Sequence, residues 1–183
     1  VVEDKKGNQY VWIPCTTEDS KSQLQFKRKE WDVEVDGTDN SRASKDELTL
    51  TCEENYSENG LTYAVVNEIV AQVKAEKESV RKNGGYYIGR YEARKSILNN
   101  LTEVKSDVVW NNINQLDAAQ QAQNMYNNEK YISDLLNSYS WDTAISFIQK
   151  FSGQINYSNQ ITVNAGPIIA QYGTTDKQCN IFD

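Results

Sequence analysis

Three cysteines carry the most reactive side chains of this chain, and the sequence contains no histidine. Cys15, Cys52 and Cys179 show no Cys-x-x-Cys spacing, so the sequence predicts neither a zinc ribbon nor a thioredoxin-like redox pair. Without histidine, Ser-His-Asp triads, Cys-His pairs and His-ligated zinc sites are excluded within this chain. Only Lys or Arg is available to activate Cys15 as a nucleophile, so we interpret it as a buried structural thiol.

Carboxylates are the next candidates for chemistry. Adjacent pairs occur at Glu18-Asp19, Asp46-Glu47 and Glu53-Glu54. Neighbouring side chains on a strand point to opposite faces, whereas acid–base catalysis needs carboxyl groups that converge on one substrate. We interpret these pairs as solvated loop charge. Another acidic cluster, Asp36, Asp39 and Asn40, offers oxygen ligands, but its spacing misses the EF-hand loop and lacks the terminal Glu. The residues thus predict no catalytic, cofactor-binding or metal-binding site.

Basic residues cluster at two places, Lys27-Arg28-Lys29 and Arg90 with Arg94-Lys95. The chain has 19 Lys and Arg against 26 Asp and Glu, a formal net charge of −7. Nucleic acid and anionic membranes repel such a field, so we interpret the basic residues as local ion-pair partners and predict no nucleic-acid partner.

The elements that must position these residues begin with a predicted strand at 9–13, rich in β-formers and followed by Pro14. Residues 16–60 show no sustained hydrophobic periodicity, so we expect this segment to be a variable insertion. Within it, the alternation at Trp31, Val33 and Val35 fits a short strand or a hairpin. An apolar stripe predicts a helix over 63–82 that ends at Asn83-Gly84-Gly85, and a strand over 86–93 follows.

The second half of the chain predicts two more helices. Val108-Val109-Trp110 indicates a strand end. Asn114 caps a helix that runs to about residue 127, with alanines on a face suited to close packing. Ser140 caps a third helix, on which Trp141, Ala144, Ile145 and Ile148 share a face.

Length and composition indicate one domain without a membrane segment. The chain has 183 residues, of which 38% are hydrophobic, and its apolar runs reach four residues, far short of the roughly 20 that a membrane helix needs. Eleven Tyr and four Trp remain to be placed. Binding modules use such residues for broad, rigid contact, and core packing explains Trp12, Trp110 and Trp141 equally well.

Several segments in order along the chain resemble the formylglycine-generating (sulfatase-modifying factor) family. They are Tyr10-Val11-Trp12-Ile13-Pro14, Gly84-Gly85-Tyr86-Tyr87-Ile88-Gly89-Arg90-Tyr91-Glu92-Ala93, Val109-Trp110-Asn111-Asn112-Ile113 with Asp117-Ala118, and Ser140-Trp141-Asp142. The resemblance spans about residues 7–183 apart from the insertion. It is nearest to bacterial surface-associated members with long insertions.

This resemblance implies an α+β, C-type-lectin-like fold, in which two to three helices pack on small antiparallel sheets amid much irregular structure. We expect residues 1–183 to form a single, incomplete domain that corresponds to the N-terminal part of the family fold. The family's catalytic cysteine pair lies beyond a motif expected just after Asp183, and Cys179 matches neither cysteine. No catalytic, cofactor-binding or metal-binding residue transfers to this chain; the resemblance implies no cofactor here and calcium only in a completed domain.

The function that we expect is ligand recognition without catalysis, by a lectin-like module of a bacterial surface or secreted protein. Its partner is an unidentified protein or glycan, and its location is extracellular or at the cell surface. Two alternatives stay open. One is a truncated oxidase of the formylglycine-generating type, which modifies a cysteine in a partner protein, and the other is a structural spacer of a surface assembly.

Overall fold

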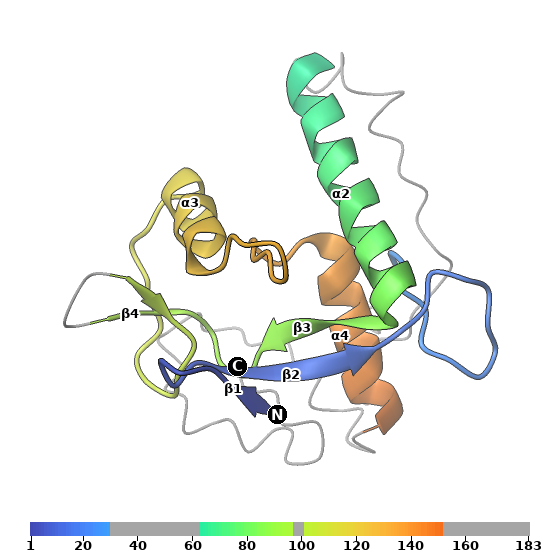
Figure 1. Cartoon of the computed structure of the whole chain (residues 1–183), viewed down its shortest axis with the longest axis horizontal. Coiled ribbons are helices and arrows are strands. Elements are labelled where there is room, and N and C mark those ends of the chain that lie inside the picture. The colour runs from blue at the N-terminus through green and yellow to red at the C-terminus, as the bar shows by residue number, and fades with distance from the viewer. Residues whose placement is uncertain (30–62, 97–100, 152–183) are drawn as a thin grey trace, which may run out of the picture. The chain divides into compact units, whose positions relative to one another are not determined.

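The structure, a computed structural model, describes residues 1–29, 63–96 and 101–151. In these residues the chain forms three helices and two small antiparallel sheets, consistent with the predicted α+β class (Figure 1). The chain divides into two compact units. Unit 1 comprises Val1–Trp12, Tyr87–Asn137 and Phe147–Asp183, and unit 2 comprises Ile13–Tyr86 and Ser138–Ser146.

The larger sheet has the strand order β1-β2-β3, formed by Val2–Glu3, Gln9–Pro14 and Gly85–Gly89. β1 pairs antiparallel with β2, with Val2 opposite Tyr10 and Glu3 opposite Gln9. The predicted strand at 9–13 is confirmed. Because successive side chains of a strand alternate between faces, Val11 and Ile13 are buried together on one side of β2.

β3 ends at Gly89, four residues before the predicted strand end at residue 93. The backbone bends tightly there, since a Cβ at position 89 would lie 2.9 Å from the Tyr91 carbonyl oxygen and 3.0 Å from Val104 Cγ1. Only glycine fits this close approach. The predicted continuation to residue 93 is therefore wrong, because the chain turns away from the sheet.

Unit 2 is built around α2, Tyr63–Asn83, which confirms the helix predicted over 63–82. Val70, Val73 and Val80 are buried along one side of it, as the apolar stripe requires. Gly84 ends the helix in the left-handed region, with φ of 76°. Its N–H donates to the Val80 carbonyl at 2.7 Å, the hydrogen bond expected of a glycine that closes a helix.

Buried aromatic and aliphatic side chains complete the core of unit 2. Phe26 stacks on Tyr139, with ring centroids 5.9 Å apart, and meets Tyr86 edge-on at 5.6 Å. Leu24 and Phe26 belong to the first part of the predicted insertion, and both are buried. The remainder of that insertion, with the alternation at residues 31–35, lies outside the described residues.

α4, Ser138–Phe151, corrects the predicted helix start and decides between the two interpretations of Trp141. The helix begins two residues before Ser140, so Ser140 lies inside it and is not its N-cap. Trp141 is 54% exposed and is not a core residue. The buried side instead carries Ser140, Thr143 and Ala144. Ser140 is satisfied there, because its carbonyl accepts a hydrogen bond from Tyr86 Oη at 2.5 Å and its hydroxyl donates to Glu76. The buried Thr143 hydroxyl has no hydrogen-bond partner among the described residues.

Unit 1 contains α3, Gln115–Met125, with the predicted cap in place: Asp117 N donates to Asn114 Oδ1 at 2.9 Å. The helix contacts β5, and none of its residues is fully buried. β4 and β5, Arg94–Lys95 and Thr102–Glu103, form the second sheet. The predicted strand end at 108–110 is wrong, because those residues take no strand conformation in the structure.

Candidate functional site

The described residues that were first considered for catalysis are held in structural roles. Cys15 is buried, as the sequence predicted. Burial, with a smaller contribution from the Glu76 charge, raises the pKa of the Cys15 thiol to about 12. A nucleophilic cysteine needs the opposite shift. Cys52 and Cys179 lie outside the described residues.

The other candidates for chemistry do not converge on a site. Glu18 and Asp19 lie in a loop, where Gln25 Nε2 donates to Asp19 Oδ1 at 3.4 Å. In the part of the chain that the structure describes, no three acidic or cysteine side chains come together as a metal site. The remaining acidic pairs and the possible calcium loop at 36–40 lie outside that part.

Two of the basic side chains form the ion pairs predicted for them. In unit 2, Arg28 Nε donates to Asp142 Oδ2 at 2.9 Å, and the Lys29 backbone N–H donates to the same oxygen at 2.8 Å. In unit 1, Arg94 donates to Glu103 Oε2 from Nε at 2.9 Å and from Nη2 at 2.7 Å, and it also pairs with Asp107. These arginines therefore hold segments of the fold together.

What unit 1 presents instead is an uncharged, largely aromatic face of its sheet, which we call the aromatic face: Val2, Tyr10, Trp12 and Tyr87. Val2 and Tyr10 are directly opposite each other, and Trp12 is two residues further along β2, so the three side chains lie on one side. Trp12 and Tyr87 meet edge-to-face, with ring centroids 4.8 Å apart and planes at 60°.

The aromatic face is accessible although its members are large and apolar. Val2 is 46% exposed, Tyr87 is 47% exposed, and Tyr10 and Trp12 are half-buried. The opposite side of the same strands carries Glu3 and Gln9 together with the buried Val11 and Ile13. There Gln9 Nε2 donates to Glu3 Oε2 at 2.8 Å and Arg90 Nη1 donates to Gln9 Oε1 at 2.7 Å. The alternation of β1 and β2 thus places the aromatic face opposite the side on which Val11 and Ile13 are buried.

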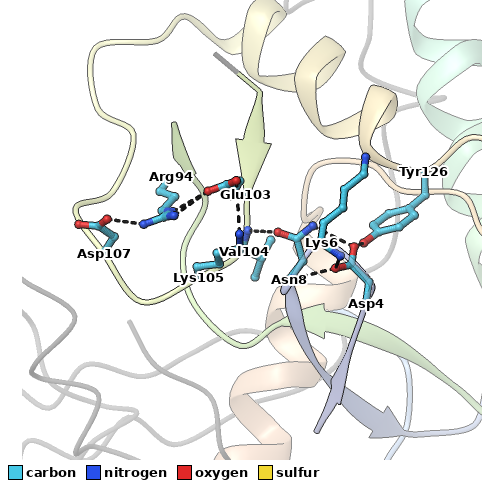
Figure 2. Close-up of polar contacts among 9 residues, drawn as sticks. All are labelled: Asp4, Lys6, Asn8, Arg94, Glu103, Val104, Lys105, Asp107 and Tyr126. Carbon is cyan, nitrogen blue, oxygen red and sulfur yellow. Dashed lines mark hydrogen bonds and ion pairs between the residues drawn. The ribbon is translucent and has the colours of Figure 1, made fainter. Parts of the chain in front are cut away.

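A chain of hydrogen bonds, here called the tyrosine chain, fixes one end of the aromatic face: Tyr10, Tyr126 and Asp4. Tyr10 Oη donates to Tyr126 Oη at 3.3 Å. Tyr126 Oη in turn donates to Asp4 Oδ2 (Figure 2). The two rings also pack edge-to-face, with centroids 5.9 Å apart. Tyr126 directly follows α3, so this helix delivers the ring that supports Tyr10.

Asp4 is the anchor of the tyrosine chain, and all of its acceptor positions are used. Besides Tyr126, its carboxylate accepts hydrogen bonds from Lys6 N and Asn8 N, both at 2.8 Å, and from Asn8 Nδ2 at 3.0 Å. Burial raises the pKa of Asp4, but the hydrogen bonds from Tyr126 and Asn8 outweigh it, so the pKa lies below its ordinary value. Asp4 is therefore an ionised, saturated acceptor, not a general base.

The phenols stay protonated for complementary reasons. Burial and then the hydrogen bond with Tyr126 raise the pKa of Tyr10. Burial and then the hydrogen bond to Asp4 raise the pKa of Tyr126. Protonated phenols beside an ionised carboxylate give the tyrosine chain a single direction, from Tyr10 toward Asp4.

Buried Asn8 ties this arrangement to the smaller sheet. Its Oδ1 accepts a hydrogen bond from Val104 N at 2.9 Å (Figure 2). Beside it, Gln9 N donates to the Val104 carbonyl at 3.0 Å. Val104, which follows β5, is buried. The β1–β2 turn, β5 and the end of α3 consequently support the aromatic face as one hydrogen-bonded group.

Comparison of the chain with protein-family models, curated proteins and solved structures finds no match. Among the described helices, none has the length and apolar character needed to cross a membrane. The sequence signal for the aromatic face was the spacing of Tyr10 and Trp12. Nothing in the sequence connects either residue to Tyr126 or Asp4.

Proposed function

We propose that this chain is a non-catalytic, lectin-like recognition module of a bacterial surface or secreted protein, and that the aromatic face contacts its ligand. The family resemblance supports a C-type-lectin-like fold for it. The observation that carries the proposal is an aromatic pair, the half-buried Trp12 and the exposed Tyr87, on one sheet face of an acidic chain.

Physical chemistry favours a binding role for such a face. A large aromatic ring gains most from burial, yet Tyr87 stays 47% exposed. Aromatic rings offer wide contact area at a low cost in side-chain entropy, because only two torsions must be fixed. The strand register and the tyrosine chain hold the face before a ligand arrives, which lowers the cost of binding further.

The test is a binding screen of the full chain against arrays of glycans and of secreted and cell-surface proteins. We expect saturable binding that Trp12→Ala or Tyr87→Ala weakens at least tenfold. Trp141→Ala is the matched control, because it removes an equally large exposed ring from α4 in unit 2. Binding that Trp12→Ala leaves intact, or no binding in either array, would refute the proposal.

A further inference from the structure

We infer that Asn83 is a site of spontaneous deamidation, which proceeds when the last turn of α2 opens. The reaction consumes only water, and it is independent of the ligand recognition proposed above. Asn83 is the last residue of α2, and Gly84 links the helix to β3. Both residues are exposed, so water and hydroxide reach the Asn-Gly pair in the folded chain.

Glycine after asparagine supplies the nucleophile of this reaction. The backbone nitrogen of Gly84 attacks the side-chain carbonyl carbon of Asn83, and a residue without a Cβ leaves that approach unhindered. Packing does not restore the hindrance. A Cβ built at position 84 would meet no atom of the described residues within 4 Å beyond its chain neighbours. The surroundings of Gly84 therefore leave room for ring closure.

Bonds and protons balance with water as the only co-reactant. Hydroxide removes the Gly84 N–H proton, the nitrogen bonds to Asn83 Cγ, and the Cγ–Nδ2 bond breaks to release ammonia. Water then opens the five-membered imide ring. Cleavage at Cγ gives aspartate, and cleavage at the main-chain carbonyl carbon gives isoaspartate. Each product carries one more negative charge than asparagine at neutral pH.

Three hydrogen bonds of the last helical turn slow the reaction in the folded chain. Gly84 N–H donates to the Val80 carbonyl at 2.7 Å, which holds the proton that must leave. Asn83 Nδ2 donates to the Ser79 carbonyl at 2.9 Å and to Ser79 Oγ at 3.3 Å, which holds the amide that must be attacked. Every partner lies within this turn of α2, so both groups are freed when one turn opens. Helix ends open at a far lower free-energy cost than a whole domain unfolds.

Deamidation changes the junction between α2 and β3. A new carboxylate at the C-terminal end of a helix is repelled by the helix dipole. Isoaspartate also routes the backbone through the side chain and lengthens it by one atom. The added atom directly precedes Gly84, whose carbonyl accepts a hydrogen bond from Cys15 N at 3.1 Å. The modification thus alters both the charge and the length of this junction.

The experiment incubates the full chain over a range from neutral to mildly alkaline pH, folded and in guanidinium chloride above the unfolding transition. Trypsin cleaves after Lys82 and Arg90 and isolates residues 83–90, in which Asn83 is the only asparagine. Mass spectrometry then detects the gain of one dalton, and fragmentation separates aspartate from isoaspartate. The control variant is Asn83→Gln, because a glutamine must close a larger ring and reacts far more slowly.

We expect both products at position 83 in the folded chain, at a rate proportional to hydroxide concentration and roughly tenfold to a hundredfold below that of the unfolded chain. The Asn83→Gln peptide should keep its mass. Folded chain that stays unmodified after roughly a hundred half-lives of the unfolded-state reaction would overturn the inference, because only whole-domain unfolding protects a site so strongly.

Denaturant distinguishes the two routes to the reactive state. If one turn opens, little surface is exposed, and the rate stays nearly constant at guanidinium concentrations below the unfolding transition. A rate that rises steeply from the first addition of denaturant, in proportion to the unfolded fraction, would show that only the unfolded chain reacts and would overturn the inference.

Discussion

Asp142 on α4 is a buried carboxylate whose removal tests how unit 2 is held together. It is 4% exposed, and its Oδ2 accepts hydrogen bonds from Arg28 Nε at 2.9 Å and Lys29 N at 2.8 Å. A hydrogen bond to a charged group contributes about 1.5–3 kcal/mol. The Arg28 side chain is 30% exposed, so water replaces part of its share. We expect Asp142→Ala to lower the free energy of unfolding by about 3 kcal/mol.

Two further variants separate the contributions. Asp142→Asn keeps an acceptor oxygen for Lys29 N and loses the charge, so we expect a loss of about 1–2 kcal/mol. In a double-mutant cycle, Arg28→Ala and Asp142→Ala should couple by about 1 kcal/mol or more. Urea unfolding at neutral pH measures all of these values. A loss below about 0.5 kcal/mol in Asp142→Ala, the range of ordinary surface substitutions, would refute the reasoning.

Three other outcomes follow from the structure. Trp141→Ala should change the free energy of unfolding by less than about 1 kcal/mol, because the ring is 54% exposed. Urea unfolding measures this change, and a loss near about 3 kcal/mol would mean that the ring is buried. Folding lowers the pKa of Asp4 from 3.8, so the ionised Asp4 carboxylate stabilises the fold fully above that pH and loses this effect as the pH falls through the folded-state pKa. The difference in unfolding free energy between wild type and Asp4→Asn should therefore shrink below pH 3.8, and a constant difference would contradict this. In a variant whose single cysteine is Cys15, a disulfide reagent at neutral pH should react at least a hundredfold more slowly with folded than with unfolded chain, and equal rates would show an accessible thiol.

Local sequence signals predicted the elements whose causes are local. β2 follows from a run of β-formers before Pro14, and α2 follows from its valine stripe and the glycine at position 84. The start of α3 follows from Asn114, whose side chain accepts the Asp117 N–H. In each case the stabilising partner lies within a few residues, so the sequence pattern carries the information.

α4 shows what such patterns cannot predict. The apolar face predicted for this helix includes Trp141, yet that ring is exposed. The polar Ser140 and Asp142 are buried instead, and distant residues satisfy them. Asp142 binds Arg28, which lies 114 residues away in the sequence, and Ser140 bonds with Glu76 and Tyr86. Burial of a polar side chain is decided by its tertiary partners, which single-sequence periodicity does not contain.

The aromatic face lies between these cases. The spacing of Tyr10 and Trp12 places them on one side of a strand from the sequence alone. The pairing of Trp12 with Tyr87 depends on how β3 is aligned with β2, and the contact with Tyr126 spans 116 residues. The sequence therefore indicated rings suited to binding, and the structure was needed to assemble them into one face.

The most direct test of the aromatic face is an NMR titration of the full chain with the array ligand that it binds best. Indole N–H signals can be assigned by replacing single tryptophans with phenylalanine. We expect the Trp12 indole signal to shift and to saturate with the binding isotherm, while the Trp141 indole signal stays in place. A stationary Trp12 signal at full occupancy, with the shift at Trp141 instead, would contradict it.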